Sequence, residues 1–140
     1  MIGADQAMEA LYQTVKAIPA VTAAIGARLY PNEAPPATVA PFGRFYFSGG
    51  EAAQPVGVGV SAERLVFTIE FIDRGPSTAK IRAAAKATQV ALHAMRYVTA
   101  DQYSVAGRYV RSTSFPLPTE QGNTYVRLAG DFEMFVSYPS

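Results

Sequence analysis

The feature that most constrains this chain is an alternation of apolar and polar side chains over residues 64–72, broken only at Val66 and Ile72. The apolar positions are Leu65, Phe67, Ile69 and Phe71, and the polar positions between them include Arg64, Thr68 and Glu70. Successive side chains of a strand point to opposite faces of its sheet. The segment is therefore predicted to be a strand with one buried face and one face that carries charge.

Three further segments are predicted to be strands. Residues 42–47 alternate weakly, and residues 103–115 and 123–138 form a final pair that is joined through residues 116–122. In the last segment one face holds Val126, Leu128, Phe132, Met134, Val136 and Tyr138. The opposite face of that segment holds Arg127, Asp131 and Glu133.

Two helices are predicted from apolar residues at three- and four-residue spacing. Residues 5–17 carry Met8, Leu11, Tyr12 and Val15 at that spacing, and the Ala-rich residues 78–96 carry Ile81, Ala84, Ala85, Thr88, Leu92 and Met95. A short helical turn is expected at residues 20–25, because Pro19 precedes it and Gly26 follows it. The proline-rich residues 31–41 are expected to be an extended connector.

These elements predict one α+β domain over residues 1–140, with a mostly antiparallel sheet of about four strands and two main helices packed on one face. About four strands at ~4.8 Å spacing make a sheet about 19 Å wide, which two helices at ~8–10 Å spacing can cover. One face of the sheet is therefore left without helices.

The uncovered face is predicted to carry a mixture of charged, aromatic and aliphatic groups. Its residues are Arg44, Tyr46, Arg64, Val66, Glu70, Ile72, Arg127, Asp131 and Glu133. One interpretation is a solvated face with ion pairs between arginines and carboxylates on neighbouring strands, and it is favoured for an isolated domain. The other is self-association, because an exposed sheet edge needs either protection or a partner.

Composition excludes most catalytic chemistry. The chain has no cysteine, which excludes a disulfide framework and a thiolate metal site, and its only histidine, His93, is expected near a helix end in a capping or surface role. With 49% hydrophobic and 16% charged residues and a net charge of +1, it is neither disordered nor broadly basic. No enzymatic activity, cofactor or metal is expected. The alternative is a small ligand- or metal-binding domain that uses Glu70, Asp131 and Glu133.

The Gly- and Ala-rich residues 49–61 are predicted to form a long flexible loop. Residues 57–62 match the dinucleotide pattern G-x-G-x-x-A, but a strand and not a helix is expected to follow, so a chance match is favoured. A loop this long exceeds what a turn needs, which makes it a candidate for function.

No membrane segment is expected. The longest apolar stretches fall well short of the ~20 residues that a membrane-spanning helix needs. Residues 1–9 carry acidic side chains where a signal peptide would be basic. A soluble protein made in the cytoplasm is predicted.

Several segments together resemble the tail terminator (tail completion) proteins of long-tailed bacteriophages and gene transfer agents. The resemblance begins with the N-terminal helix, the Ile-Gly-Ala-Arg-Leu-Tyr-Pro of residues 25–31, and Ala40-Pro41-Phe42 at the start of a strand. It continues through the strand of residues 65–73, the Ala-rich helix of residues 77–95 and the closing segment of residues 120–133. The loop of residues 49–61 departs from the family pattern.

The resemblance implies a structural virion protein, made in the host bacterium, that forms a ring, usually a hexamer, at the head-proximal end of the tail. Such a ring binds the last ring of the major tail tube protein, stops tube polymerisation and presents a surface to the head connector or neck protein. Double-stranded DNA passes through its lumen without sequence-specific binding. An adjacent neck or stopper protein of the same assembly is the alternative within this class.

The candidate interface residues toward a neighbouring subunit or the tube are Arg28, Tyr30, Glu51, Gln54, Val58, Arg74, Arg108 and Arg111. The arginines are chosen because a guanidinium forms the bidentate, partly buried pairs that protein interfaces use. Glu51, Gln54 and Val58 belong to the long loop.

Overall fold

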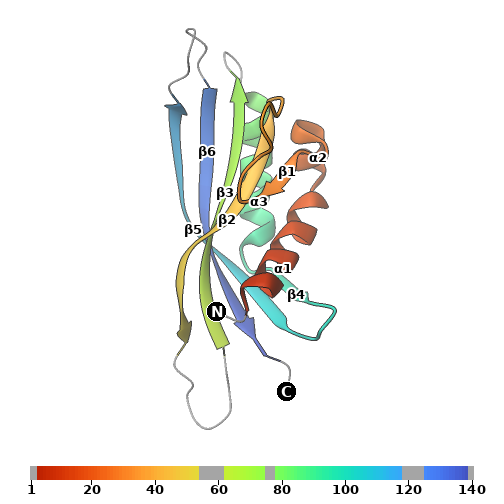
Figure 1. Cartoon of the computed structure of the whole chain (residues 1–140), viewed down its shortest axis with the longest axis vertical. Coiled ribbons are helices and arrows are strands. Elements are labelled where there is room, and N and C mark those ends of the chain that lie inside the picture. The colour runs from red at the N-terminus through yellow and green to blue at the C-terminus, as the bar shows by residue number, and fades with distance from the viewer. Residues whose placement is uncertain (1–2, 54–61, 75–77, 118–124, 139–140) are drawn as a thin grey trace.

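A six-stranded sheet runs the length of the molecule, and three helices lie together on one of its faces (Figure 1). This computed structural model describes residues 3–53, 62–74, 78–117 and 125–138. The α+β class is as predicted.

The strands are β1 (Leu29–Pro31), β2 (Phe42–Ala53), β3 (Ala62–Arg74), β4 (Arg96–Val98), β5 (Ser104–Leu117) and β6 (Tyr125–Ser137). Their order in the sheet is β1-β2-β3-β6-β5-β4, so the long β3 and β6 form its centre. The β1–β2 pair is parallel, and the other neighbouring pairs are antiparallel. The sheet is therefore mixed.

The helices are α1 (Ala4–Lys16), α2 (Pro19–Ile25) and α3 (Ala79–Leu92). α1 begins one residue before its predicted start, and Asp5 lies in its first turn, where a carboxylate is favoured by the helix dipole. Gly26 ends α2 with φ 59, a conformation that favours glycine.

The expected sheet of about four strands is corrected to six strands, whereas the two main helices are present and α2 confirms the short helical turn expected at residues 20–25. The two missed strands are β1 and β4, which have three residues each. Three residues are too few for a visible alternation of apolar and polar side chains. Their pairing with β2 and β5 makes them strands, and local sequence does not reveal that pairing.

The predicted helix over residues 78–96 is also corrected, because α3 ends at Leu92. Met95 continues the helical spacing of Leu92, which extended the prediction too far. In the structure Ala94 takes φ 64, outside the helical region, and its amide donates to the carbonyl oxygen of Gly107 on β5. His93 is the C-cap residue of α3, in agreement with the expected capping role.

β2 extends six residues beyond its predicted end at residue 47. Residues 49–53 of the expected loop are therefore strand, and residues 54–61 lie outside the described residues. The extension follows from pairing with β3, which continues to Ala53 opposite Ala62 after a bulge near Ser48. Its Gly- and Ala-rich sequence has no alternation that could have predicted a strand.

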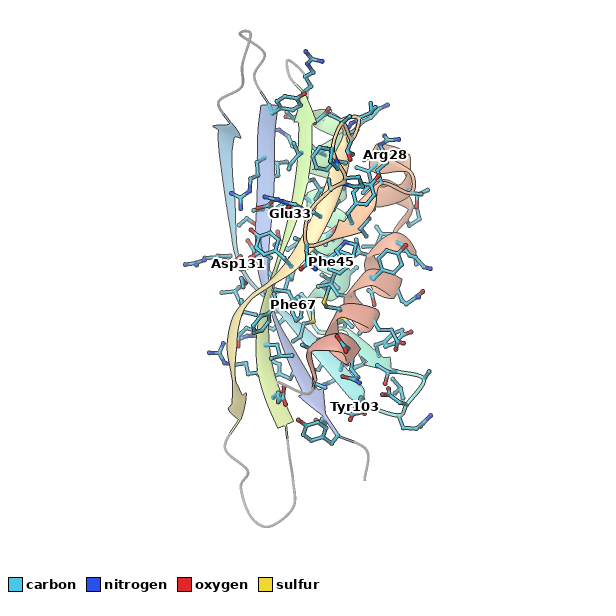
Figure 2. All side chains as sticks on the ribbon, viewed as in Figure 1. Arg28, Glu33, Phe45, Phe67, Tyr103 and Asp131 are labelled. Carbon is cyan, nitrogen blue, oxygen red and sulfur yellow. The ribbon has the colours of Figure 1, made fainter. Side chains whose placement is uncertain are left out.

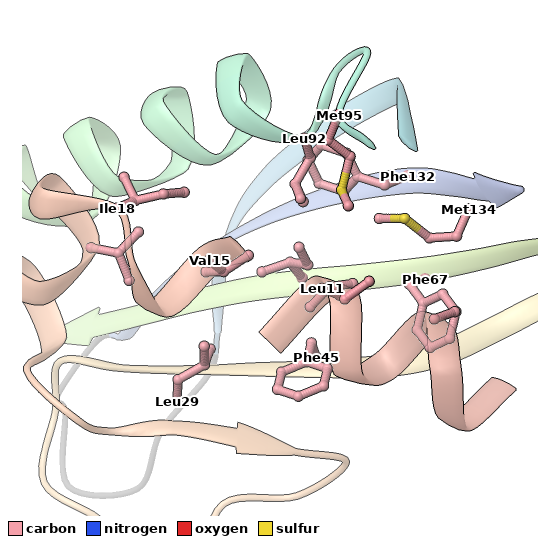
Figure 3. Close-up of a cluster of buried hydrophobic side chains, with 14 of the residues drawn as sticks. Leu11, Val15, Ile18, Leu29, Phe45, Phe67, Leu92, Met95, Phe132 and Met134 are labelled. Atoms are coloured by element: carbon pink, nitrogen blue, oxygen red, sulfur yellow. The ribbon is translucent and has the colours of Figure 1, made fainter. Parts of the chain in front are cut away.

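The core lies between the helices and the sheet (Figure 3). Leu11 and Val15 of α1 and Leu92 of α3 pack in the same cluster as the strand side chains Phe67 and Phe132, and all five are at most 2% exposed. Removing such a side chain from water stabilises the fold by ~1.5–3 kcal/mol. The buried sides of these two helices include Leu11, Val15, Ile81, Ala84, Thr88 and Leu92, all predicted to face inward.

Candidate functional site on the open face of the sheet

We call the sheet face opposite the helices the open face. It carries the described side chains of Arg44 and Tyr46 on β2, Arg64, Thr68 and Glu70 on β3, Arg127, Asp131 and Glu133 on β6, and Arg108 and Arg111 on β5. The antiparallel register places them side by side, with Arg44 opposite Glu70, Thr68 opposite Asp131, and Arg108 opposite Glu133. Figure 2 shows Asp131 on this side of the sheet.

Glu70 lies at the centre of the first cluster and is fully buried. Its carboxylate forms ion pairs with Arg44 and Arg127, and it accepts a hydrogen bond from the Tyr46 hydroxyl at 2.8 Å. Burial alone would raise the pKa of Glu70, but the hydrogen bonds from Arg127, Arg44 and Tyr46 outweigh it and hold that pKa below its usual value. Glu70 is therefore held as a carboxylate.

Glu133 forms the second cluster. It pairs with Arg64, at 3.1 Å between Nη1 and Oε2, and with Arg108 on the other neighbouring strand. The hydrogen bond from Arg108, with a smaller contribution from Arg64, lowers the pKa of Glu133. One carboxylate thus joins three adjacent strands.

Asp131 forms the third cluster. Arg111 donates from Nε to Oδ2 at 2.8 Å, and the Thr68 hydroxyl donates to Oδ1 at 2.8 Å. We call these three clusters the ion-pair lattice, whose members are Arg44, Arg64, Arg108, Arg111, Arg127, Glu70, Asp131 and Glu133. Its arginine stems cover the strands, so the face is less solvated than expected, with Thr68 and Ile72 at 5% and 7% exposure.

The lattice confirms the favoured interpretation of cross-strand ion pairs and bears on the metal-binding alternative. β3 and β6 are neighbours, as that alternative required. However, each of the three carboxylates is already bound by at least one arginine. Within the described residues, no three or more His, Asp or Glu side chains are placed to hold a metal ion.

The predicted interface residues fall into separate regions. Arg108 and Arg111 belong to the lattice, whereas Arg28 lies near α2, where its Nε donates to the Pro41 carbonyl oxygen at 2.8 Å (Figure 2). Tyr30 is half-buried on β1, and the guanidinium of Arg74 at the end of β3 stacks over the Tyr125 ring.

The three interface candidates from the expected loop are less well placed. Glu51 pairs along the backbone with Arg64, at an open-face position of β2, and its side chain is not described. Gln54 and Val58 lie outside the described residues. The structure therefore does not bring the eight candidates into one surface.

Sequence reasoning missed Glu63, which is 5% exposed on the helix-covered face. It accepts a hydrogen bond from the Gly3 amide at 3.2 Å and another from the Tyr138 hydroxyl. This hydrogen bond to Glu63 is the main reason that the pKa of Tyr138 rises to about 12. The sequence could have shown this, because Glu63 lies two and four residues before Leu65 and Phe67 and therefore shares their face of the strand.

A cavity of about 260 Å³ lies on the helix side, between α3 and the sheet. Its lining is mainly apolar, with Phe71, Leu128 and Phe132 from the sheet, and Arg82 and Gln89 contribute from α3. It contains none of the predicted site residues and falls below the ~300 Å³ at which ligand pockets usually begin.

No helix in the described part of the chain is both long and apolar enough to cross a bilayer.

Comparison with known proteins places this fold. The family model described as tail completion protein gp17 matches residues 9–128. A chain from a structure titled "Virion of native gene transfer agent (GTA) particle" is similar in fold, with a TM-score of 0.67, 21% sequence identity and coverage of 91% of each chain. No curated protein sequence matches this chain.

Proposed function

The chain belongs to the tail completion protein gp17 family, and from this premise we propose that it is a structural tail protein that forms a ring, hexameric by resemblance, at the head-proximal end of a phage-like tail. The ring caps the tube formed by the major tail tube protein, stops its growth and provides the joint to the head connector. Family membership confirms the resemblance predicted from the sequence. The match over residues 9–128 is the observation that carries the proposal.

The sheet edges support a ring. The edge strands β1 and β4 pair with only three residues each of β2 and β5, which have 12 and 14 residues. Among the described residues, no strand pairs with the outer edge of β2 beyond Phe45 or of β5 beyond Ala106. Such edges are places where another chain adds. Contacts between two different edges are heterologous and close into a ring when the rotation permits.

The ring proposal has a direct test in particle assembly. When the gene for this chain is inactivated, we expect tube polymerisation to run past its normal end and electron micrographs to show tails of variable, excessive length without heads. Re-expression of the full chain should restore uniform tails. Uniform tails that fail to join heads would instead favour the neck or stopper alternative, and normal particles would refute both.

A second measurement tests the ring itself. Light scattering of the purified chain with and without assembled tubes should give the mass of a closed oligomer on the tubes. A chain that remains monomeric at high concentration and ignores tube ends would contradict the proposal.

A further inference from the structure

Arginine is concentrated on the open face, and lysine is absent from it. The five lattice arginines are joined by Arg74 and Arg96, which occupy positions of the same parity on β3 and β4. The chain's three lysines all lie in helices, at Lys16 in α1 and Lys80 and Lys86 in α3. At open-face positions seven arginines therefore stand against four carboxylates, Glu51, Glu70, Asp131 and Glu133.

The carboxylates hold the five lattice arginines in place. Glu70 and Glu133 each bind two guanidinium groups, and Asp131 binds one. Exposure is greatest on β5, where Arg108 and Arg111 present 59% and 73% of their side-chain surface to solvent. A phosphate that approaches the face therefore meets arginines that are accessible but already partly neutralised.

We propose that the open face is the surface along which double-stranded DNA passes, and that Glu70, Asp131 and Glu133 hold its arginines so that DNA is guided without being gripped. The inference rests on the proposed function, which brings DNA through the ring. Free arginines would bind phosphates tightly and in a salt-dependent way. Arginines that are already paired exchange one anion for another, which weakens each contact.

The pairing favours DNA in transit over a docked acidic protein. A stable acidic partner would gain most from cations that no carboxylate binds, and within the described residues Lys80, Arg82 and Lys86 of α3 form no ion pair. On the open face, by contrast, every described carboxylate is bound to arginine, so the lattice arginines are paired. A surface of this kind suits a polyanion that must keep moving.

The test is to remove a holding carboxylate and measure DNA affinity of the purified full chain. Glu133→Gln releases Arg108 and removes the ion pair of Arg64 with Glu133, and Asp131→Asn releases Arg111. Asp101→Asn is the matched control, because it changes the net charge equally at an exposed turn where Asp101 contacts Thr99 and Gln6. The probe is a short DNA duplex at about 50 mM and about 200 mM salt.

The ratio of affinities between the two salt concentrations should rise ~3-fold for each released arginine. E133Q and D131N should therefore both show a higher ratio than the natural chain, and D101N should match the natural chain. Equal effects of E133Q and D101N would overturn the proposal, because net charge alone would then explain them. So would a gain in affinity for poly-glutamate without a gain for DNA, which would indicate an acidic protein partner.

Two further readouts keep the test decisive. Circular dichroism checks folding, and if E133Q is unfolded then D131N decides the outcome, since Asp131 retains 22% side-chain exposure. Tail length of particles is scored separately. If inactivation of the gene gives overlong tails but E133Q and D131N leave DNA affinity unchanged, this inference alone is refuted. Normal tails after inactivation would refute the proposed function.

Discussion

On β3, the side chains that point toward the helices are Leu65, Phe67, Ile69 and Phe71, whereas those that point away include Arg64, Thr68 and Glu70. Both sets contain buried residues, since Phe67 and Glu70 are each fully buried. The helix-covered face is stabilised by apolar burial, which has no preferred direction. The open face depends on charged hydrogen bonds with fixed partners. One strand thus combines a mainly apolar face with a face that carries ion pairs.

The largest effect is expected on the helix-covered face. Phe67→Ala removes a fully buried ring that lies 5.7 Å from the Phe47 ring and should lower the free energy of unfolding by about 3–5 kcal/mol. Urea unfolding followed by circular dichroism measures this loss. Phe47→Ala is the control, because Phe47 is 41% exposed and its removal should cost much less. Equal losses would show that burial does not separate the two positions.

Glu70→Gln should be the most damaging change on the open face. It keeps the shape of the side chain but leaves Arg44 and Arg127 without their carboxylate, at a cost of about 2–3 kcal/mol. The same urea titration measures it. Unlike F67A, this variant should lose stability only near neutral pH, and its difference from the natural chain should shrink in acid. A difference that is constant with pH would contradict the role of the charge.

Acid should weaken the ion pairs of the open face. The pKa values of Glu70 and Glu133 are lowered in the folded chain, so between the folded and the unfolded pKa values the folded state binds fewer protons than the unfolded state. Their contribution is present above pH 4.5 and is lost as pH falls through the folded pKa values. Thermal melts across this range should show the loss in the natural chain and in F67A, and a smaller loss in E70Q.

Alkali tests the contact between Tyr138 and Glu63 on the helix-covered face. The pKa of Tyr138 is raised from 10.0 to about 12, so its hydrogen bond to Glu63 stabilises the fold below pH 10 and is lost as pH rises toward 12. Tyr138→Phe should remove this pH dependence and cause a small loss at neutral pH. Thermal melts between these pH values measure it, and an unchanged alkaline loss in Y138F would exclude Tyr138 as its cause.

The smallest effect is expected at the rim of the open face. Arg111 is 73% exposed and pairs with Asp131, so Arg111→Ala should change the free energy of unfolding by less than about 1 kcal/mol. Arg127→Ala is the comparison, because Arg127 is only 16% exposed and bound to Glu70. A loss in R111A as large as in R127A would remove the distinction between the centre and the rim of the lattice.

Much of this molecule could be predicted from periodicity. The α+β class, the long strands β3 and β6 and the buried sides of α1 and α3 follow from apolar spacing alone. The open-face charges on β3 and β6 were identified for the same reason. β1, β4 and the outer part of β2 were missed, because pairing makes them strands and no local alternation does. The partners of β1 lie 14 residues away along the chain, those of β4 lie 6–10 residues away, and those of the outer part of β2 lie 9–17 residues away.

The sequence by itself determined which side chains of β3 and β6 share a face, because a strand alternates its side chains whatever its neighbours are. Only the tertiary structure decided which charges meet. Glu133 binds Arg64 and Arg108, which are 69 and 25 residues away, because β6 lies between β3 and β5. Strand order brings charges from distant parts of the chain within hydrogen-bond distance, and no local pattern encodes that order.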